Sequence, residues 1–590
     1  MQPPPPAGPP APADSPADRP ADPLEGSERA AAAEPSVGSA TRSPPLPRWP
    51  SPGLRAALLA VFLLMAALAG YGLGGPFLHG HYGYHAGEYS TRARHTLRHH
   101  DFLPSNQLGF SKPERDSYYL HHPILTHQLV TLTLGLFGER ETSVRLAALL
   151  SSLGAQALLL LLILRRFGPG LAVLGGAVFA LIPINVWFAP HIDPGFPSIV
   201  CVLGFFLFYL RWLDAGRFRD GGLALLCAGL SVFFEWSPYL AAVPIGVHAL
   251  GVAARRRGRY ALFVPLLVVA MLLPLGVHFL VVYKLDHLSE MRESYRMRSD
   301  GPTLTQYWKS ILSYARSLYG TGMCAAVAAW LGVLVVRTAQ RRWRPVHLVS
   351  VSFFFAVVAY VHLFRSAVLI HAYRMLYGNV MCALIVVELA EAAGALAASL
   401  ARRSPQGAAR ARTLAAAAVG TALVLTMLRP AAEALLESRQ KGGVPFVAGY
   451  DPELVRVGFI KRVHELTTTA DRVYMHPSLH IRKDLYFYLD RDLEYWPVGP
   501  SVVRALPSAK QAHAVYVYQA DALVPQERFE LDALKATHPV LRVGPFEMLD
   551  LRRTGPELTV EVLAPPPHRG PLARYWQGPY YHPQVVAPPR

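Results

Sequence analysis

Long apolar runs, separated by short charged segments, dominate the sequence between residues 54 and 430. Residues 146–164 and 260–283 contain no Asp, Glu, Lys or Arg. A helix needs about 20 apolar residues to cross a hydrocarbon core of about 30 Å. The pattern therefore predicts an α-helical polytopic membrane protein with about 11 transmembrane helices. The predicted spans are residues 54–74, 146–164, 169–189, 198–213, 221–236, 239–253, 260–283, 319–336, 346–363, 368–390 and 411–429.

Arginine-rich loops alternate with the predicted spans. Loops on one side carry groups such as Arg165-Arg166 and Arg255-Arg256-Arg257, whereas several loops on the other side contain almost no Arg or Lys. Lys and Arg are retained on the cytoplasmic side of a membrane. We therefore predict a cytoplasmic N-terminus and a C-terminus on the outer side. Residues 124–137 are short for a span, so we place them as an interfacial helix in the first outer loop, residues 76–145.

The two ends of the chain differ from the middle. Residues 1–50 are rich in Pro, Ala and Ser and show no apolar periodicity, which predicts a disordered cytoplasmic tail. Residues 431–590 predict an extracytoplasmic α/β domain that ends in an irregular, Pro-rich segment of about thirty residues. Its expected helix covers 452–467, and its expected strands are 472–475, 485–489, 514–518, 540–543 and 546–551.

Composition and charge narrow the class of protein further. Only 16% of the residues are charged, against roughly 25% in a soluble domain. The net charge of +17 arises from clusters beside the apolar runs, which favours contact with membrane lipids and excludes nucleic acid as a partner. The abundance of Ala, Pro and Arg is typical of a GC-rich bacterial genome, so we expect a bacterial inner (plasma) membrane.

Three outer segments place polar side chains at or near membrane depth, where such groups are costly and usually functional. The first is the loop that follows the first span, the second is the turn between the third and fourth spans, and the third begins the tenth span. A further acid lies near the outer end of the fifth span. The candidate residues are Glu88, Arg92, Arg94 and His122, then Asp193, then His371, Tyr373 and Arg374, and finally Glu235.

An ordered series of short motifs runs through residues 55–240. It comprises Glu88 with Ala93-Arg94, then His122-Pro123, Leu136-Phe137-Gly138, Val144-Arg145-Leu146, Arg165-Arg166-Phe167-Gly168, Asp193 and Glu235-Trp236. In this series the chain resembles the GT-C glycosyltransferases, in particular the group of aminoarabinose transferases and protein O-mannosyltransferases. Two positions depart from the family pattern. Glu88 stands alone where many relatives have Asp-Glu, and Ile124 replaces the second Pro of His-Pro-Pro.

The resemblance implies inverting transfer of a sugar from a polyprenyl-phosphate donor to a lipid, glycan or protein acceptor on the non-cytoplasmic face. Such a reaction needs a carboxylate base and cations for the leaving phosphate. Glu88 is the candidate base, and Asp193 is a candidate for holding a divalent metal ion or for orienting the acceptor. We expect Arg94 and Arg374 to grip one phosphate, with help from Arg92, His371 and Tyr373. His122 and Glu235 are further candidates.

Simpler interpretations stay open for each of these residues. Glu88 and Arg92 have the spacing of a surface ion pair on a helix, and Asp193 before Pro194 suits a turn. His371, Tyr373 and Arg374 also fit anchoring at the membrane interface. His95 and His99 have the spacing of metal ligands on a helix, although a solvated loop rich in His fits equally.

The whole chain also allows other functions, namely a transporter or flippase of a lipid-linked substrate, or a catalytically silent receptor or scaffold. Transporters often contain internal repeats. The sequence shows no such repeat, and its polar candidates gather on one side, which favours an enzyme.

Overall fold

The computed structural model describes residues 51–71, 73–77, 81–107, 109–299, 303–401, 404–440, 452–479, 483–494, 497–563 and 583–586. The predicted tail, residues 1–50, lies outside these residues, as do 564–582 and 587–590 of the predicted Pro-rich end. Residues Trp49–Arg590 belong to one compact unit.

The helical part follows the predicted spans closely. Each predicted span falls on a helix, and eight helical segments are long and apolar enough to cross a membrane among the described residues. The helices are α1 (Pro52–Gly70), α2 (His81–His99), α3 (Leu125–Phe137), α4 (Glu141–Phe167), α5 (Pro169–Leu181), α6 (Pro183–Phe188), α7 (Gly195–Ala215), α8 (Phe218–Phe234), α9 (Ser237–Arg256), α10 (Arg259–Lys284), α11 (Leu288–Ser299), α12 (Leu304–Tyr319), α13 (Thr321–Ala339), α14 (His347–Leu363), α15 (Arg365–Ile370), α16 (Tyr377–Leu400) and α17 (Pro405–Gln440).

Three predicted spans differ in detail from the helices that form. The span 169–189 breaks at Ile182, because Pro183 cannot continue the hydrogen bonding of α5 and instead begins α6. The span 368–390 begins in the last residues of α15 and passes through a short 3-10 segment, Ala372–Met375, before α16 starts. The span 411–429 is part of a much longer helix, because α17 continues through the predicted domain boundary at residue 430.

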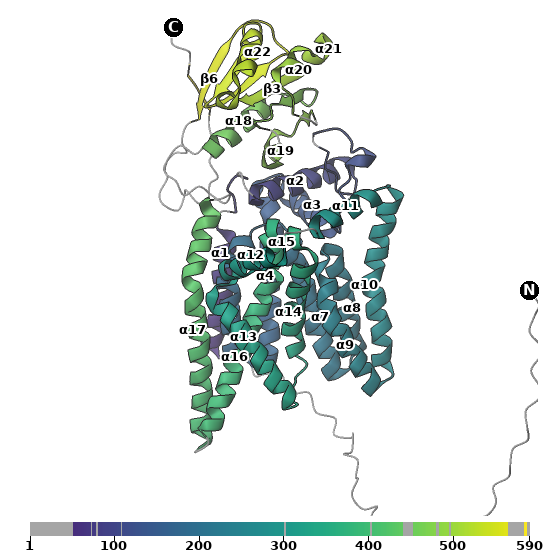
Figure 1. Ribbon diagram of the computed structural model, residues 1–590, viewed down its shortest axis with the longest axis vertical. Helices are drawn as coiled ribbons and strands as arrows, with labels where there is room; N and C mark the ends of the chain where they lie inside the picture. Colours follow the sequence, from purple (N-terminus) through teal and green to yellow (C-terminus); the bar gives the residue numbers. More distant parts are fainter. Residues whose placement is uncertain are drawn as a thin grey trace, which may run out of the picture. The chain divides into compact units, whose positions relative to one another are not determined.

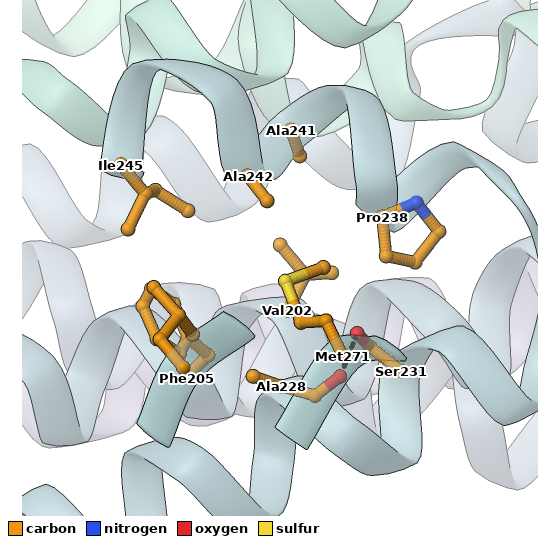
Figure 2. A pocket seen from close by; sticks show the side chains of 10 residues that line it. Val202, Phe205, Ala228, Ser231, Pro238, Ala241, Ala242, Ile245 and Met271 are labelled. Atoms are coloured by element: carbon orange, nitrogen blue, oxygen red, sulfur yellow. Dashed lines mark hydrogen bonds between the residues drawn. The ribbon is translucent and has the colours of Figure 1, made fainter. Parts of the chain in front are cut away.

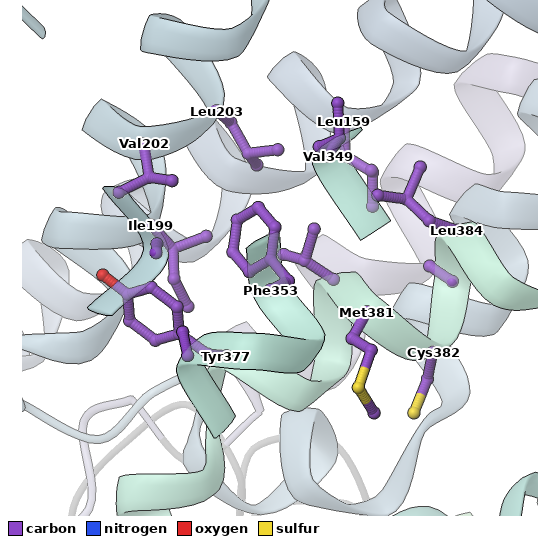
Figure 3. Close-up of a cluster of buried hydrophobic side chains, with 14 of the residues drawn as sticks. Leu159, Ile199, Val202, Leu203, Val349, Phe353, Tyr377, Met381, Cys382 and Leu384 are labelled. Atoms are coloured by element: carbon purple, nitrogen blue, oxygen red, sulfur yellow. The ribbon is translucent and has the colours of Figure 1, made fainter. Parts of the chain in front are cut away.

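The core of the helical part is a layer of apolar side chains between neighbouring helices (Figure 3). Phe353 of α14 lies among side chains of α7 and α16, and it is fully buried. Small residues let the backbones approach, as they do in other membrane helices. A Cβ atom at Gly175 of α5 would lie 2.5 Å from the Ile163 side chain of α4 and 3.0 Å from Val387 of α16.

The C-terminal part forms a mixed sheet with helices around it (Figure 1). The strand order is β2-β1-β3-β5-β4-β6-β7, in which β1 is parallel to β2 and β3, and β4 is parallel to β6. The elements are α18 (Pro452–Leu466), β1 (Arg472–Met475), α19 (Lys483–Leu489), β2 (Asp492–Leu493), α20 (Pro500–Arg504), α21 (Ser508–Gln511), β3 (Ala514–Gln519), α22 (Pro525–Lys535), β4 (Val540–Val543), β5 (Phe546–Asp550), β6 (Leu558–Leu563) and β7 (Pro583–Val586).

Two expectations for this part are wrong. Residues 485–489 were expected to form a strand but belong to helix α19, and Asp484 to Leu489 are all buried. Burial on every side removes the alternation that separates a helix from a strand in sequence. The expected irregular end contains a strand, because Pro583–Val586 pairs with β6 in antiparallel register.

Candidate active site

Helix α2, in the first outer loop, brings the predicted outer segments together. His85 and Tyr89 are four residues apart and so share a face of the helix. The ring of His85 lies 5.4 Å from that of His191, 6.0 Å from that of His371 and 5.6 Å from that of Tyr373. Side chains from the first loop, from the turn after α6 and from the segment before α16 therefore meet in one cluster.

Asp193 lies in the turn between α6 and α7 and is 3% exposed. Its Oδ1 atom accepts a hydrogen bond of 2.8 Å from the N–H of Gly195. Its Oδ2 atom is buried and has no hydrogen-bond partner among the described residues. Burial raises the pKa of Asp193 to about 7, with Arg374 opposing the rise and Glu235 adding to it. The carboxyl group therefore changes its charge near neutral pH.

Arg374 joins two other candidates beside Asp193. Its Nη1 atom lies 3.2 Å from Oε1 of Glu235, and its Nη2 atom donates to Nε2 of His122 at 3.2 Å. Burial, and after it the charge of Arg374, lowers the pKa of His122 well below its ordinary value, so this imidazole is neutral and can accept the bond. The second oxygen of Glu235 accepts a bond of 3.3 Å from the hydroxyl of Ser198.

Glu88 lies in a different setting, between two cations. Its Oε1 atom pairs with Nη2 of Arg92 and with Nζ of Lys483 of α19, the latter at 2.6 Å. Arg92 is itself held by Asn106, whose Oδ1 accepts from its Nε atom at 3.1 Å, and its guanidinium lies 3.7 Å from the centre of the Tyr119 ring. Burial acts to lower the pKa of Lys483, but the charge of Glu88, the charge of Tyr84 and the hydrogen bond to Glu88 together raise the pKa overall.

The two clusters carry opposite charge. The group of Glu88, Arg92 and Lys483, which we call the outer trio, has two cations for one carboxylate. The group of Asp193, Glu235 and Arg374, which we call the buried trio, has one cation for two carboxylates. A phosphate is attracted to the first arrangement and repelled by the second.

Arg94 is placed apart from the other candidates. Its Nε atom binds Glu139 at 2.6 Å, its Nη1 atom lies 3.1 Å from Asp490, and its Nη2 atom donates to the carbonyl of Phe487 at 3.1 Å. These contacts tie the outer loop to the C-terminal part. The geometry therefore favours an anchoring role for Arg94, and its assignment to the donor phosphate stays a prediction.

The residues that could hold a metal ion do not form a complete ligand set. Among the residues that the structure describes, no three His, Cys, Asp or Glu side chains gather in a way that would bind a metal. The rings of His95 and His99 stack at 5.6 Å. Burial, followed by the charge of His99, lowers the pKa of His95 to about 4. A role for Asp193 as a metal ligand stays a prediction.

A small apolar cavity of about 20 Å³ lies between α7, α8, α9 and α10 (Figure 2). Ser231 and Pro238, on either side of Glu235 in the sequence, both line it. This space holds about one water molecule, far less than a sugar needs. The cavity is therefore too small to be the site of sugar transfer.

The chain is similar to known proteins in sequence and in fold. Residues 121–281 match the family described as dolichyl-phosphate-mannose-protein mannosyltransferase, and this segment contains His122, Asp193 and Glu235. The structure of ArnT from Cupriavidus metallidurans bound to undecaprenyl phosphate is similar, with 15% identity and a TM-score of 0.57 over 85% of this chain and 98% of that chain. Apo ArnT from the same organism gives 14% identity and a TM-score of 0.53 over 84% of this chain and 97% of that chain. No curated protein matches the sequence significantly.

The resemblance to GT-C glycosyltransferases that the motifs indicate is confirmed by this family match together with the shared fold. The fold class is confirmed as well, as a polytopic helical membrane protein with a small C-terminal sheet region. Sequence reasoning missed Lys483, Asn106 and Tyr119, which complete the surroundings of Glu88 and Arg92. Lys483, at the start of α19, and Asn106, in a loop, carry no spacing signal that could have identified them.

Proposed function

We propose that this chain is a glycosyltransferase that moves a sugar from a polyprenyl-phosphate donor to a hydroxyl of a lipid, glycan or protein acceptor on the non-cytoplasmic face. The observation that carries the proposal is the pair of carboxylates in opposite electrostatic settings at helix α2. ArnT, which shares the fold, binds undecaprenyl phosphate, and this supports the same class of lipid donor here.

The transfer step uses the outer trio. The acceptor oxygen attacks the anomeric carbon, the bond from that carbon to the phosphate oxygen breaks, and the electron pair leaves with the polyprenyl phosphate. The proton of the acceptor hydroxyl passes to the Glu88 carboxylate, which pairs with two adjacent cations in the free protein. Arg92 stabilises the charge that develops on the phosphate, because a guanidinium fork matches phosphate oxygens.

The buried trio positions the acceptor. A buried carboxylate oxygen without a partner is costly, and Oδ2 of Asp193 is such an atom among the described residues. An acceptor hydroxyl that donates to this atom would remove the cost and fix the direction of attack. Arg374 holds Glu235 and His122 in place beside it.

The test uses the full-length protein purified in detergent, supplied with undecaprenyl-phosphate-linked sugars and candidate acceptors. Separate assays with a hexose and a pentose donor define the sugar. We expect a glycosylated product and the release of undecaprenyl phosphate. Detergent leaves no second compartment, so product formation excludes transport as the sole function. Donor binding without product for any sugar and acceptor in the panel would contradict the proposal and favour the receptor alternative.

A further inference from the structure

The C-terminal part docks tightly on the first outer loop. Helix α19 packs against α2, and one buried apolar cluster contains Ala86 and Ala93 of α2 together with Leu485 and Tyr488 of α19. The hydroxyl of Tyr488 accepts a bond of 2.6 Å from the N–H of Phe77. Further ion pairs and hydrogen bonds between the two regions join Arg98 to Asp490 and Phe110 to Asp492.

A glycine permits the closest approach between these helices. A Cβ atom at Gly87 would overlap the carbonyl oxygen of Lys483 and lie 2.7 Å from Cα of Asp484. Both atoms belong to the backbone of α19, so a side chain at position 87 would push that helix away. The contact brings Lys483 to the residue next to Gly87, which is Glu88, although 395 positions separate Lys483 and Glu88 in the sequence.

Three features of Lys483 fit a ligand for phosphate. Its ammonium group is 2.6 Å from the carboxylate of Glu88, which also pairs with Arg92, so both cations converge on one point. Its side chain is 30% exposed, so a ligand can reach it. The outer trio carries one more positive than negative charge, and a lysine ammonium binds phosphate as a point charge.

We propose that Lys483 of the C-terminal part is a second ligand of the donor phosphate, acting together with Arg92. This inference rests on the proposed function and adds a residue to it. In the free protein, the Glu88 carboxylate occupies the position beside Arg92 and Lys483 that the donor phosphate would take. Donor phosphate competes with Glu88 for the same two cations, and its binding releases the carboxylate to act as the base.

This competition has a consequence that a purely structural role for Lys483 lacks. Removing the charge of Glu88 leaves both cations without their carboxylate, so Glu88→Gln should bind undecaprenyl phosphate more tightly than the wild type. Removing the charge of Lys483 should weaken the same binding. A lysine that only anchors the C-terminal part would change neither affinity in this opposed way.

The experiment measures binding of undecaprenyl phosphate, and separately of inorganic phosphate, to the full-length protein in detergent. We expect Lys483→Met to weaken binding of the lipid roughly 10- to 100-fold, Lys483→Arg to restore much of it, and Glu88→Gln to strengthen it several-fold. Lys461→Met is the matched control. Lys461 also comes from the C-terminal part and lies 3.5 Å from Glu141 of α4, but it is not near Glu88 by any contact in the described structure. Its loss should leave binding unchanged.

Thermal unfolding of each variant identifies a loss of fold, and Glu88→Gln tests the proposal even if Lys483→Met does not fold. Unchanged affinity of Lys483→Met for undecaprenyl phosphate, or weaker binding by Glu88→Gln, would overturn the role of Lys483. Sugar transfer by the wild type would still support the proposed function in that case. A wild type that binds neither lipid nor phosphate would instead overturn the proposed function. Equal changes for inorganic phosphate and for the lipid would mean that the site recognises the phosphate group alone.

Discussion

Glu88 and Asp193 are the same kind of group in opposite surroundings. Glu88 pairs with Arg92 and Lys483, and its side chain is 12% exposed. Asp193 is buried, has one oxygen without a partner among the described residues, and titrates at a pKa of about 7. Two acids in different surroundings can divide catalytic roles. In the mechanism that we propose, Glu88 removes the proton and Asp193 accepts a hydrogen bond from the acceptor.

The strongest test of this division replaces Glu88 by Gln. The substitution is nearly isosteric and removes only the charge and basic oxygen, so turnover should fall roughly 10²- to 10⁴-fold. Initial rates with saturating donor measure the effect in purified protein. Near-normal turnover would reduce Glu88 to an ion-pair partner of Arg92 and Lys483, and Asp193 would then be the remaining candidate base.

A smaller effect is expected for Asp193→Asn. Loss of the hydrogen-bond acceptor for the substrate should lower turnover about 10- to 100-fold through poorer positioning. In the wild type, turnover should rise as the pH passes through about 7, because Asp193 becomes ionised there. This rise should be absent in Asp193→Asn and should persist in the residual activity of Glu88→Gln. A rise that survives in Asp193→Asn must come from another group and would contradict the assignment.

The titration of Asp193 should lower the stability of the fold as the pH rises, whereas it should raise turnover. The pKa of Asp193 is about 7 in the folded state against an ordinary value of 3.8, so the folded state binds this proton more tightly than the unfolded state. Raising the pH between these values therefore favours unfolding. Asp193→Asn lacks this penalty, and its melting temperature relative to the wild type should be higher at pH 8 than at pH 5. An unchanged difference between the two pH values would show that Asp193 is already ionised in the fold.

The contact between Glu88 and the C-terminal part can be tested by a substitution that changes no charged residue. Gly87→Ala should displace α19 and with it Lys483, and we expect donor affinity to fall by up to roughly tenfold. Gly246→Ala in α9 is the control, because a Cβ atom there meets nothing within 4 Å. That change should be neutral or slightly stabilising. Equal donor affinity in Gly87→Ala and wild type would show that the outer trio tolerates movement of α19.

The sequence predicted the helical part well because each span is a local, one-dimensional signal. Charge-free runs such as 260–283 are long and apolar enough to cross a hydrocarbon core, so their interpretation needs no knowledge of the fold. The break at Pro183 was visible in principle, since proline cannot continue the hydrogen bonding of a helix. Orientation of the chain rests on the arginine-rich loops and stays a prediction.

The candidate site was harder to predict because its contacts are not local. His122, Glu235 and Arg374 were chosen separately as polar residues near the membrane. Only the fold places Arg374 3.2 Å from Glu235 and 3.2 Å from His122. Nothing in the sequence marked Lys483 as a site residue, because its proposed role depends on the packing of α19 against α2. The sequence analysis also predicted residues 485–489 as a strand, although they belong to α19. A partner nearly four hundred residues away cannot be found from spacing.

The smallest expected effect concerns Arg94 and Arg374, which were predicted to hold one phosphate because the predicted topology puts both at the outer membrane surface. Arg94 is instead occupied by Glu139, Asp490 and the carbonyl of Phe487. Arg94→Lys keeps the charge but loses the planar fork, so it should lower stability by roughly 1–3 kcal/mol and leave donor affinity within about twofold.

The double variant Arg94→Lys with Arg374→Lys decides between shared and separate roles. Because the two guanidinium groups have different partners, their effects on donor binding should add to within about 0.5 kcal/mol. Affinity for undecaprenyl phosphate in the wild type, both single variants and the double variant provides the measurement. Clear non-additivity would mean that both arginines grip one ligand, and the phosphate would then have to approach the buried trio despite its two carboxylates. Protonation of Asp193 near neutral pH would be the condition for that approach, so the non-additivity should then weaken as the pH rises above 7.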